Sequence, residues 1–380
     1  MARPAAGPIL TMIYIVTQCF FPSVGGIEGA MTGLADHLAA QGHAVRVFAD
    51  GDARDAAGDS AKAYPIQRFD GPKPWRRWRK HAAVRRARRG EAVRGVFADS
   101  WKSVAAIPEG LGSISVLAHG SEFPEPDEVS PGKRAKIEAA LARADAILAN
   151  SLYTAARVRP FLKGRPERVV LIQASIEPQP EPSPEGIKRA AEVIAGGGPV
   201  LMTLARLEPR KGVDMTLRAL PGLAQRHPGL VYVVAGGGED AGRLKALAAE
   251  LGVEARVRFT GRVDDDLRAG LLAACDVFSM PVRKEGDSVE GFGLTYVEAG
   301  WYGAPSVAGR EGGAATAVLD GEVGLLCDGA DPASVEAALG RLLDDEALRR
   351  RLGDAAQARA RAFTWDRRLP EYLKTLGIGG

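Results

Sequence analysis

Cysteine is scarce in this chain of 380 residues, and its spacing excludes the common forms of cysteine chemistry. The three cysteines, Cys19, Cys275 and Cys327, lie far apart and form no C-x-x-C pair. Zinc sites and disulfide frameworks need paired or closely spaced cysteines. The pattern therefore argues against metal and disulfide roles, and it favours buried thiols in a reducing cytoplasm.

Neither sign of charge dominates, and no apolar run is long enough to span a bilayer. Fifty Lys and Arg against 47 Asp and Glu give a net charge of +3, which is too near neutral to indicate a partner. The apolar run from Ile9 to Phe21 contains Gln18 and is followed by no small-residue cleavage site, so we interpret it as a buried strand rather than a signal peptide. We expect Met12 to be the natural start and residues 1–11 to be unstructured.

Glycine is abundant instead, with 46 residues that cluster where short strands would give way to helices. In the first half of the chain, strands and helices are expected to alternate, which predicts a parallel sheet covered by helices. The expected strands are Met12–Val16, Ala44–Ala49, Gly95–Ala98, Ile114–Ala118 and Ala146–Ala149, and the expected helices are Ile27–Ala40 and Pro131–Ala142.

A Pro-rich segment at 177–186 interrupts this pattern and is typical of a semi-rigid linker. The alternation then restarts, which predicts an α/β protein of two doubly wound, Rossmann-like domains. Ligands of such sheets bind at the carboxyl ends of strands, here in a cleft between the domains. The expected strands of the second half are Val200–Leu204, Val231–Ala235, Val257–Thr260, Asp276–Val282, Ala304–Ala308 and Gly324–Cys327, and its expected helices are Val213–Gln225, Gly242–Leu251 and Asp265–Ala274.

Two loops at expected strand ends in the first half carry candidate site residues. The pair Gly25-Gly26 lets the backbone approach an anion closely, although a plain tight turn needs the same residues. His119 follows a strand and precedes Gly120. A lone histidine often only packs or forms hydrogen bonds, but its place at a strand's carboxyl end makes a catalytic role plausible.

Two further loops follow strands of the second half. Arg206 and Lys211 could clamp a diphosphate from two sides, unless they are only a solvated charged turn. The run Gly236-Gly237-Gly238 resembles a dinucleotide fingerprint. Its spacing to Gly242 is wrong and the expected acid is missing, so we rank NAD binding low.

The most informative stretch runs from Glu290 to Glu298, directly after an apolar strand. Gly291 and Gly293 allow close approach of a ligand, and a helix beginning near Leu294 would point its free N–H groups at a phosphate. The two acids would then meet opposite ends of a phosphate-containing ligand. Glutamate near a helix start also compensates the helix dipole, which is the simpler explanation.

The triplet Asp264-Asp265-Asp266 invites a metal interpretation, but it fits better as the N-terminal cap of the following helix. We therefore expect no metal site.

A basic segment at 73–94 contains ten Lys or Arg and one acid, Glu91. Trp75, Trp78 and Ala82 fall on one face at helical spacing. Tryptophan with Lys and Arg is typical of a helix that lies on an anionic membrane surface. A solvated basic helix, or a patch for acidic polysaccharide or nucleic acid, are the alternatives, and nucleic acid ranks last because no aromatic platform repeats. The candidate membrane or acceptor contacts are Trp75, Arg76, Arg77, Trp78, Arg85 and Arg86.

Taken together, these motifs resemble the retaining glycosyltransferases of family 4, which have the GT-B fold of two facing Rossmann-like domains. The resemblance rests on their order along the chain from about Met12 to the final helix: Gly25-Gly26-Ile27-Glu28, Gly42-His43-Ala44-Val45, the Arg206 to Gly212 loop, Gly236-Gly237-Gly238, Phe259 to Val263, and Glu290 to Glu298. The insert 283–289, with Val307-Ala308-Gly309, is similar to bacterial mannosyltransferases that act on phosphatidylinositol mannosides.

The resemblance implies a role for each matching position. Residues 1–177 would form the acceptor domain, completed by a C-terminal helix at 363–380, and 178–362 the donor domain. Arg206, Lys211, Gly25, Gly26 and Gly237 would lie at the donor diphosphate, Glu298 at the ribose, Val263 at the base, and Glu290 with Phe292, Gly293, Leu294 and Thr295 at the sugar and phosphates. His119 would join Glu290 as a catalytic residue, and no metal or other cofactor would be needed.

One departure from the family pattern concerns the loop after Gly312-Gly313. An acid usually follows three residues later, whereas Thr316 stands here. We expect a peripheral enzyme on the cytoplasmic face of the membrane that transfers a hexose from GDP-mannose, or secondly UDP-glucose, to a lipid or lipid-linked glycan. A sugar-nucleotide epimerase of similar fold and a non-catalytic nucleotide-sugar-binding subunit remain as alternatives.

Overall fold

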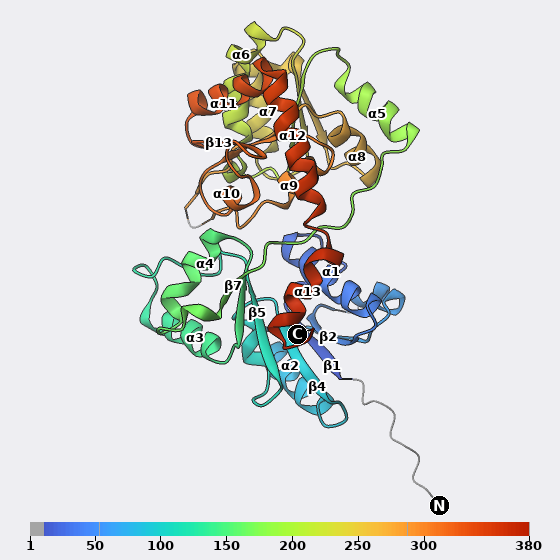
Figure 1. Ribbon diagram of the computed structural model, residues 1–380, viewed down its shortest axis with the longest axis vertical. Coiled ribbons are helices and arrows are strands. Elements are labelled where there is room, and N and C mark those ends of the chain that lie inside the picture. The colour runs from blue at the N-terminus through green and yellow to red at the C-terminus, as the bar shows by residue number, and fades with distance from the viewer. Residues whose placement is uncertain (1–10, 53, 287, 380) are drawn as a thin grey trace, which may run out of the picture. The chain divides into compact units, whose positions relative to one another are not determined.

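The computed structural model describes residues 11–52, 54–286 and 288–379, and its chain divides into two compact units (Figure 1). The first unit comprises Met1–Ser175 and Trp365–Gly380, and the second comprises Ile176–Thr364. The expectation that residues 1–11 are unstructured falls, for 1–10, outside the described residues, as does Asp287 of the insert.

A parallel sheet forms the centre of the first unit. In spatial order its strands are β3 (Ile66–Phe69), β2 (Ala44–Asp50), β1 (Met12–Thr17), β4 (Val93–Ala98), β5 (Ser113–Ala118), β6 (Ala146–Ala149) and β7 (Val169–Leu171). Successive strands are added outward from β1 in one direction and then, from β4, in the other. Such a reversal leaves a crevice at the carboxyl ends of the two central strands, where ligands of doubly wound sheets bind.

Helices cover both faces of this sheet because its strands are apolar on both sides. Ile13 and Ile15 pack under α1 and α13 on one face, whereas Tyr14 and Val16 belong to the core under α2 and α3 on the other. At Gly33 of α1, a Cβ atom would lie 2.5 Å from the indole nitrogen of Trp365, so only glycine allows this contact with α13. The α-helices are α1 (Gly26–Ala40), α2 (Lys73–Ala87), α3 (Pro131–Ala142), α4 (Leu152–Val158) and α13 (Trp365–Thr375), and the 3₁₀ helices are η1 (Asp55–Ala61), η2 (Ser103–Ala106), η3 (Arg159–Phe161) and η4 (Pro166–Arg168).

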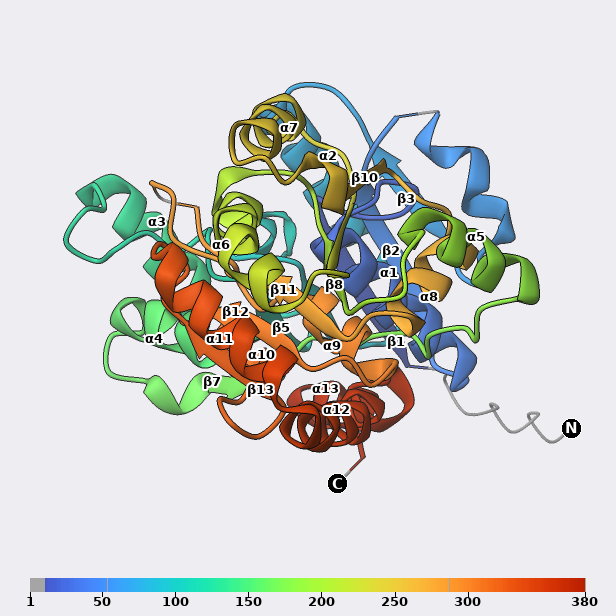
Figure 2. The ribbon, with the colours of Figure 1, turned by 90° about the horizontal axis from the view of Figure 1, so that it is seen from above.

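The second unit repeats this architecture around its own parallel sheet. In spatial order its strands are β10 (Val257–Gly261), β9 (Val231–Ala235), β8 (Val200–Leu204), β11 (Val277–Met280), β12 (Ser306–Gly309) and β13 (Gly324–Cys327). Figure 2 shows α6, α7 and α11 on one side of these strands and α8 and α9 on the other. The α-helices are α5 (Pro184–Ile194), α6 (Val213–Arg226), α7 (Ala241–Glu250), α8 (Asp265–Ala273), α9 (Leu294–Trp301), α10 (Ala314–Ala317), α11 (Pro332–Asp344) and α12 (Glu346–Arg361), and the 3₁₀ helices are η5 (Pro209–Lys211) and η6 (Glu254–Arg256).

The linker is shorter than its composition predicted. Helix α5 begins at Pro184, because Ser183 Oγ accepts a hydrogen bond from Gly186 N at 3.0 Å and proline suits the first helical turn. Asp266 anchors the start of this helix. Its carboxylate accepts hydrogen bonds from Ser183 N at 2.9 Å and from Ser183 Oγ at 2.6 Å. The prediction of a linker over 177–186 was therefore wrong for its last three residues.

The expected strand Asp276–Val282 is also shorter in the structure. It ends at Met280, and the next residue, Pro281, has no N–H to donate to a neighbouring strand.

The cysteine prediction holds for two of the three thiols. Cys275 and Cys327 are buried, whereas Cys19 is only half-buried. Burial raises the pKa of the Cys19 thiol to about 12, so this thiol stays protonated at neutral pH.

Candidate functional site

The Glu290 loop and α9 are shaped by glycine. Gly293 caps α9 with φ at +90°, a left-handed conformation that favours glycine, and a Cβ there would lie 2.4 Å from the Tyr296 ring. The helix begins at Leu294, as the sequence predicted, so its free N–H groups are directed back at the loop. Phe292 contributes backbone only, because its buried ring packs on Phe363 with the ring centroids 5.7 Å apart.

A second glycine pair holds this loop in place. Gly313 N donates to Glu290 O at 2.7 Å, and a Cβ on Gly313 would lie 1.8 Å from Gly291 O. Thr316, which stands where the family pattern has an acid, is buried in α10, and its carbonyl accepts a hydrogen bond from Arg359 at 3.0 Å. The polypeptide of the 290–293 loop is thus fixed by contacts of 312–313 that involve no side chain.

Glu290 is the centre of an ion cluster. Its carboxylate pairs with Lys211 Nζ and, at 2.9 Å, with Arg210 Nη1. Burial alone would raise the pKa of Glu290, but the charges of Lys211 and Arg210 outweigh burial and hold that pKa below its ordinary value. Glu290 is therefore a carboxylate at neutral pH, and the sequence reasoning missed Arg210.

The other predicted cation, Arg206, lies at the exposed end of the same network. Arg206 forms an ion pair with Glu208 at 3.1 Å, and Glu208 forms a second ion pair with Arg210 at 2.9 Å. The two cations predicted as a clamp are thus connected through alternating acids and bases. Lys211 is largely buried at the Glu290 end, with 12% of its side chain exposed, while Arg206 is 68% exposed.

Glu298 lies on α9, in the turn that follows Leu294, and pairs with a residue the sequence did not indicate. Its carboxylate accepts a hydrogen bond from Arg268 Nη1 of α8 at 3.2 Å, and Arg268 also donates to Gln179 at 3.1 Å. Burial raises the pKa of Glu298, and the charge of Arg268 opposes that rise. Thirty positions separate the two residues, and no local pattern in either segment points to the pair.

The glycine run after β9 packs against the loop that carries Arg206. A Cβ on Gly236 would lie 1.9 Å from Ala205 O and one on Gly238 would lie 2.2 Å from Leu207 O, while Leu207 N donates to Gly237 O at 3.0 Å. Backbone packing therefore accounts for the outer two glycines. At Gly237 the nearest atom to a Cβ would be 3.8 Å away, which leaves this position open to a ligand.

Val263 lies between β10 and α8 and is half-buried. It follows the strand end at Gly261, close in sequence to Asp264.

Asp264 caps α8 by accepting a hydrogen bond from Leu267 N at 2.9 Å, which confirms the capping interpretation. At the start of α6, Gly212 occupies the capping position, and the buried Asp214 in the first turn pairs with Arg283 at 2.8 Å.

His119 is placed in the first unit by Asp99, a residue that sequence reasoning missed. His119 Nε2 lies 3.0 Å from Asp99 O, and a carbonyl only accepts, so Nε2 carries the proton and Nδ1 is left as an acceptor. The Asp99 carboxylate accepts hydrogen bonds from Gln18 N at 2.6 Å and from Ser103 Oγ at 2.5 Å. One buried aspartate therefore joins the loops that follow β1, β4 and β5.

The glycine pair before α1 leaves open space. A Cβ on Gly26 would have no heavy atom within 4 Å, whereas one on Gly25 would meet the flexible Glu28 carboxylate at 2.3 Å. Gly26 begins α1, so its N–H belongs to a free helix start. The protein's own packing does not require glycine at Gly26, which leaves ligand approach as an explanation.

The basic helix α2 exposes its tryptophans. Trp75 is 67% and Trp78 65% exposed, and their rings meet edge to face at 6.3 Å between centroids. Arg85 and Arg86 are exposed in its last turn. Arg76 is different, because its Nε pairs with Asp50 at 2.8 Å and the side chain faces the sheet. Arg76 is therefore separated from the exposed patch with which the sequence grouped it.

Two kinds of feature are absent from residues 11–52, 54–286 and 288–379, which the structure describes. No cluster of three or more His, Cys, Asp or Glu side chains is arranged to hold a metal ion there. Nor does any helix in those ranges combine the length and apolar character needed to cross a membrane.

Comparison with known proteins identifies the family. The model of "Glycosyltransferase Family 4" matches residues 24–179, and that of "Glycosyl transferases group 1" matches residues 185–359. Between them the two models span most of the chain, in the first and the second unit respectively. The chain belongs to glycosyltransferase family 4.

Named relatives lie within the same family. The chain is 42% identical over 167 residues to the GDP-mannose-dependent alpha-(1-6)-phosphatidylinositol monomannoside mannosyltransferase of Mycolicibacterium smegmatis, covering 43% of this chain and 44% of that protein. It is 36% identical over 255 residues to the D-inositol 3-phosphate glycosyltransferase of Acidothermus cellulolyticus, covering 64% and 55%. The chain thus matches about half the length of these relatives.

Solved structures confirm the fold class. The Anabaena HepE structure with UDP and glucose superimposes with a TM-score of 0.76 at 20% identity, covering 97% of this chain and 99% of that one. A glycosyltransferase from Rickettsia africae gives a TM-score of 0.80 at 16% identity, covering 96% and 97%. The predicted GT-B fold with two Rossmann-like sheets is therefore confirmed.

Proposed function

We propose that this protein is a retaining glycosyltransferase that moves a hexose from a nucleotide-diphosphate sugar to a hydroxyl group and forms an α-linkage. The observation that carries the proposal is the cluster of Glu290, Lys211 and Arg210 next to the start of α9. It brings two cations of the loop after β8 against an ionised carboxylate in the glycine-bounded loop after β11, and this second loop leads into a free helix N-terminus. A diphosphate sugar needs these groups, the first two for its phosphates and the third for its sugar hydroxyls.

In the reaction, negative charge grows on the leaving diphosphate. Lys211, Arg210 and the N–H groups at Leu294 and Thr295 would offset that charge without a metal ion. The paired carboxylate of Glu290 would accept hydrogen bonds from the transferred sugar once the phosphates share the two cations. His119 of the first unit would serve the reaction centre through Nδ1, the nitrogen that can still accept a proton.

Glu298 would bind the ribose hydroxyls of the nucleotide. A carboxylate accepts hydrogen bonds from both hydroxyls of a ribose, and the charge of Arg268 opposes the rise in the pKa of Glu298 that burial causes. Val263 and Gly237 would lie by the base and the diphosphate, where the half-buried side chain and the open glycine leave space.

We further propose GDP-mannose as the donor, UDP-glucose as the second candidate, and a membrane lipid or lipid-linked glycan as the acceptor. Support comes from the mannosyltransferase relative, which is named as GDP-mannose-dependent and acts on a phosphatidylinositol mannoside. The exposed Trp75 and Trp78 beside Arg85 and Arg86 support peripheral contact with an anionic membrane on its cytoplasmic face.

The test is transfer itself. Purified protein is incubated with GDP-, UDP- and ADP-sugars and a membrane extract, and the product's anomeric configuration is read by NMR. Retained configuration with GDP-mannose is the expected result. Turnover of UDP-GlcNAc without an acceptor would instead identify an epimerase, and nucleotide-sugar binding without any turnover would identify a non-catalytic subunit.

A further inference from the structure

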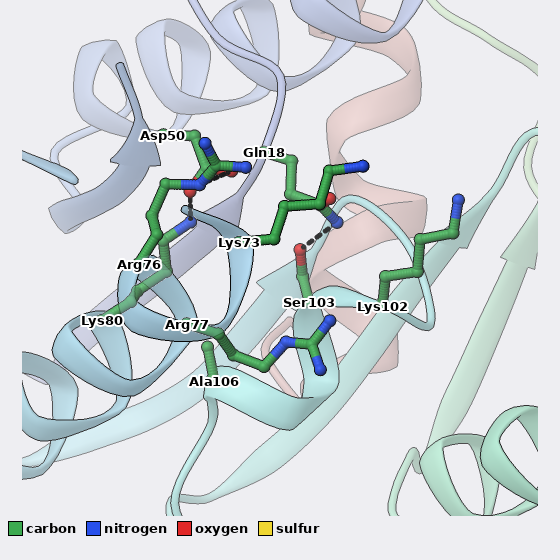
Figure 3. Close-up of a pocket in the computed structure, with 9 residues that line it drawn as sticks. All are labelled: Gln18, Asp50, Lys73, Arg76, Arg77, Lys80, Lys102, Ser103 and Ala106. Carbon is green, nitrogen blue, oxygen red and sulfur yellow. Dashed lines mark hydrogen bonds and ion pairs between the residues drawn. The ribbon is translucent and has the colours of Figure 1, made fainter. Parts of the chain in front are cut away.

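A basic pocket lies in the first unit between α2 and the loop that follows β4 (Figure 3). Five cationic side chains line it: Lys73, Arg76, Arg77, Lys80 and Lys102. Asp50 is the acid among its lining residues, so positive charge is in large excess. A concave site of one charge sign, walled by protein, concentrates ligands of the opposite charge.

Two of the five cations are already engaged by Asp50. Lys80 Nζ lies 2.6 Å from its carboxylate and Arg76 Nε lies 2.8 Å from it. Only 3% of the Lys80 side chain is exposed, and its ammonium also donates to Thr17 O at 2.6 Å. These two cations therefore form the floor of the pocket and tie α2 to β1 and β2.

The remaining three cations stand around the mouth of the pocket. Figure 3 shows Lys73, Arg77 and Lys102 around Gln18 and Ser103, on the side away from Asp50. Within the part of the chain that the structure describes, none of the three forms an ion pair with a carboxylate. Lys102 Nζ lies 5.8 Å from the Trp101 ring centroid, a cation–π contact that leaves its donors available. An anion in the pocket would supply the missing negative charge.

Hydrogen bonds connect this pocket to His119. Gln18 Nε2 donates to Ser103 Oγ at 3.3 Å, and Ser103 Oγ donates to Asp99 Oδ1 at 2.5 Å. Asp99 O in turn accepts from His119 Nε2 at 3.0 Å. If the cations hold one end of a ligand, the part of the ligand next to that end would lie on the side of the pocket that leads to His119, the candidate catalytic residue of the first unit.

The pocket and the tryptophans occupy opposite faces of α2. At about 100° per residue, Lys73, Arg77 and Lys80 lie within an arc of about 60°, whereas Trp75 lies about 170° and Trp78 about 130° from its middle. Burial agrees, because Lys80 is buried and both tryptophans are exposed. Anion binding in the pocket and membrane contact by the tryptophans are therefore separable properties of one helix.

We propose that this pocket binds a phosphate group of the acceptor, either a phosphomonoester or a phosphodiester carried by a polyol. The inference rests on the proposed transferase function and narrows its acceptor to a phosphorylated one. Lys73, Arg77 and Lys102 line one pocket and supply N–H donors for the oxygens of a phosphate, and Arg77 adds the planar fork that phosphate binds best. The polyol would extend past Gln18 toward His119, which places one of its hydroxyls for glycosylation.

Binding of small phosphates tests the pocket without any donor. The full-length protein is titrated by calorimetry with inorganic phosphate, inositol 3-phosphate and inositol at constant ionic strength. We expect inositol 3-phosphate to bind and inositol to bind at least about tenfold more weakly, since an ionic hydrogen bond is lost. Lys73→Gln, Arg77→Gln and Lys102→Gln should each weaken binding about three- to tenfold.

Matched controls guard against nonspecific charge effects. Lys136→Gln on α3 and Arg89→Gln beyond α2 remove exposed cations of the same unit that do not line the pocket. Both should bind inositol 3-phosphate as the original protein does. The proposal is overturned if inositol and inositol 3-phosphate bind alike, or if the controls lose as much affinity as the pocket variants.

Vesicles separate a lipid head group from a soluble phosphate ester as the source of the phosphate. Vesicles of phosphatidylinositol and of phosphatidylglycerol, matched in charge, are compared with the protein and with Arg77→Gln. Selective loss of phosphatidylinositol binding supports a lipid head group, and equal binding of both vesicles with retained inositol 3-phosphate affinity supports a soluble ester. A thermal shift assay with GDP, run in parallel, shows whether the protein binds the donor nucleotide. Failure of the phosphate-pocket proposal and failure of the transferase proposal therefore give different results.

Discussion

Lys211 forms its ion pair with Glu290, a carboxylate 79 positions further along the chain. The pair joins the loop after β8 to the loop after β11, two strands that are neighbours in the sheet. The cation proposed for the donor's diphosphate is therefore held by a carboxylate of the same site when no donor is bound. Donor binding would exchange one anion for another without leaving Lys211 unpaired.

Arg210 should matter to the donor as much as Lys211. Lys211→Met and Arg210→Gln are each expected to lower kcat/KM by about 10²-fold, because each removes charge that offsets the leaving diphosphate. Steady-state transfer assays measure the effect, with Arg218→Gln on the exposed side of α6 as the control. Wild-type turnover of Arg210→Gln would restrict the role to Lys211.

The pair of Glu298 and Arg268 predicts a pH dependence of nucleotide binding. Because the pKa of Glu298 is raised in the folded protein, its carboxylate takes up a proton at a higher pH than an ordinary glutamate as pH falls. Protonation removes an acceptor for ribose hydroxyls, so GDP affinity should decline as the pH falls through this raised pKa. Titration of GDP binding from neutral to acidic pH measures the midpoint.

Substitution of Arg268 tests the cause of that midpoint. Arg268→Leu removes the charge that opposes burial, so the pKa of Glu298 should rise further and the midpoint of GDP binding should move to higher pH. Arg268→Lys should restore most of the original value. A midpoint unmoved by Arg268→Leu, or one still present in Glu298→Gln, would assign the titration to another group.

Alanine substitutions at Gly313 and Gly26 should distinguish a glycine needed for stability from a glycine needed for ligand contact. Gly313→Ala places a methyl group 1.8 Å from Gly291 O, so we expect a loss of about 1–3 kcal/mol in unfolding free energy together with weaker donor binding. Gly26→Ala meets no atom within 4 Å and should leave stability unchanged or raise it by about 0.5 kcal/mol, yet lower turnover. Denaturant unfolding and transfer assays read the two effects, and full activity of Gly26→Ala would remove ligand approach as the reason for that glycine.

Membrane contact should depend on the tryptophans of α2. Trp75→Ala with Trp78→Ala should reduce sedimentation with anionic vesicles, while both substitutions leave the fold intact because the side chains are exposed. Neutralising Arg85 and Arg86 should reduce it further, in a manner screened by salt. Undiminished vesicle binding by the double tryptophan variant would make a soluble acceptor the better interpretation.

Transfer should not require a divalent ion. Activity is expected to survive EDTA, since Lys211, Arg210 and the start of α9 supply the positive charge that a metal would otherwise provide. Abolition by EDTA with recovery on adding magnesium would contradict this and would reopen the Asp264-Asp265-Asp266 triplet as a metal site.

The sequence by itself determined the elements and the places where loops carry chemistry. Strand–helix alternation, the cap at Asp264 and the helix start at Leu294 depend on neighbours within a few positions, so local periodicity and turn chemistry specify them. The glycines that follow the strand ends were recognisable for the same reason. The expected meeting of His119 with the donor stays a prediction.

Only the tertiary structure decided which charges pair. Arg268 with Glu298, Arg210 with Glu290, and Arg76 and Lys80 with Asp50 join segments 26 to 80 positions apart. Their meeting depends on strand order and on glycine contacts that bring separate loops together, and neither leaves a periodic signal in the chain. Helical spacing placed Trp75 and Trp78 on one face of α2, but it took the burial of Lys80 against β1 and β2 to show that the opposite face lines a basic pocket.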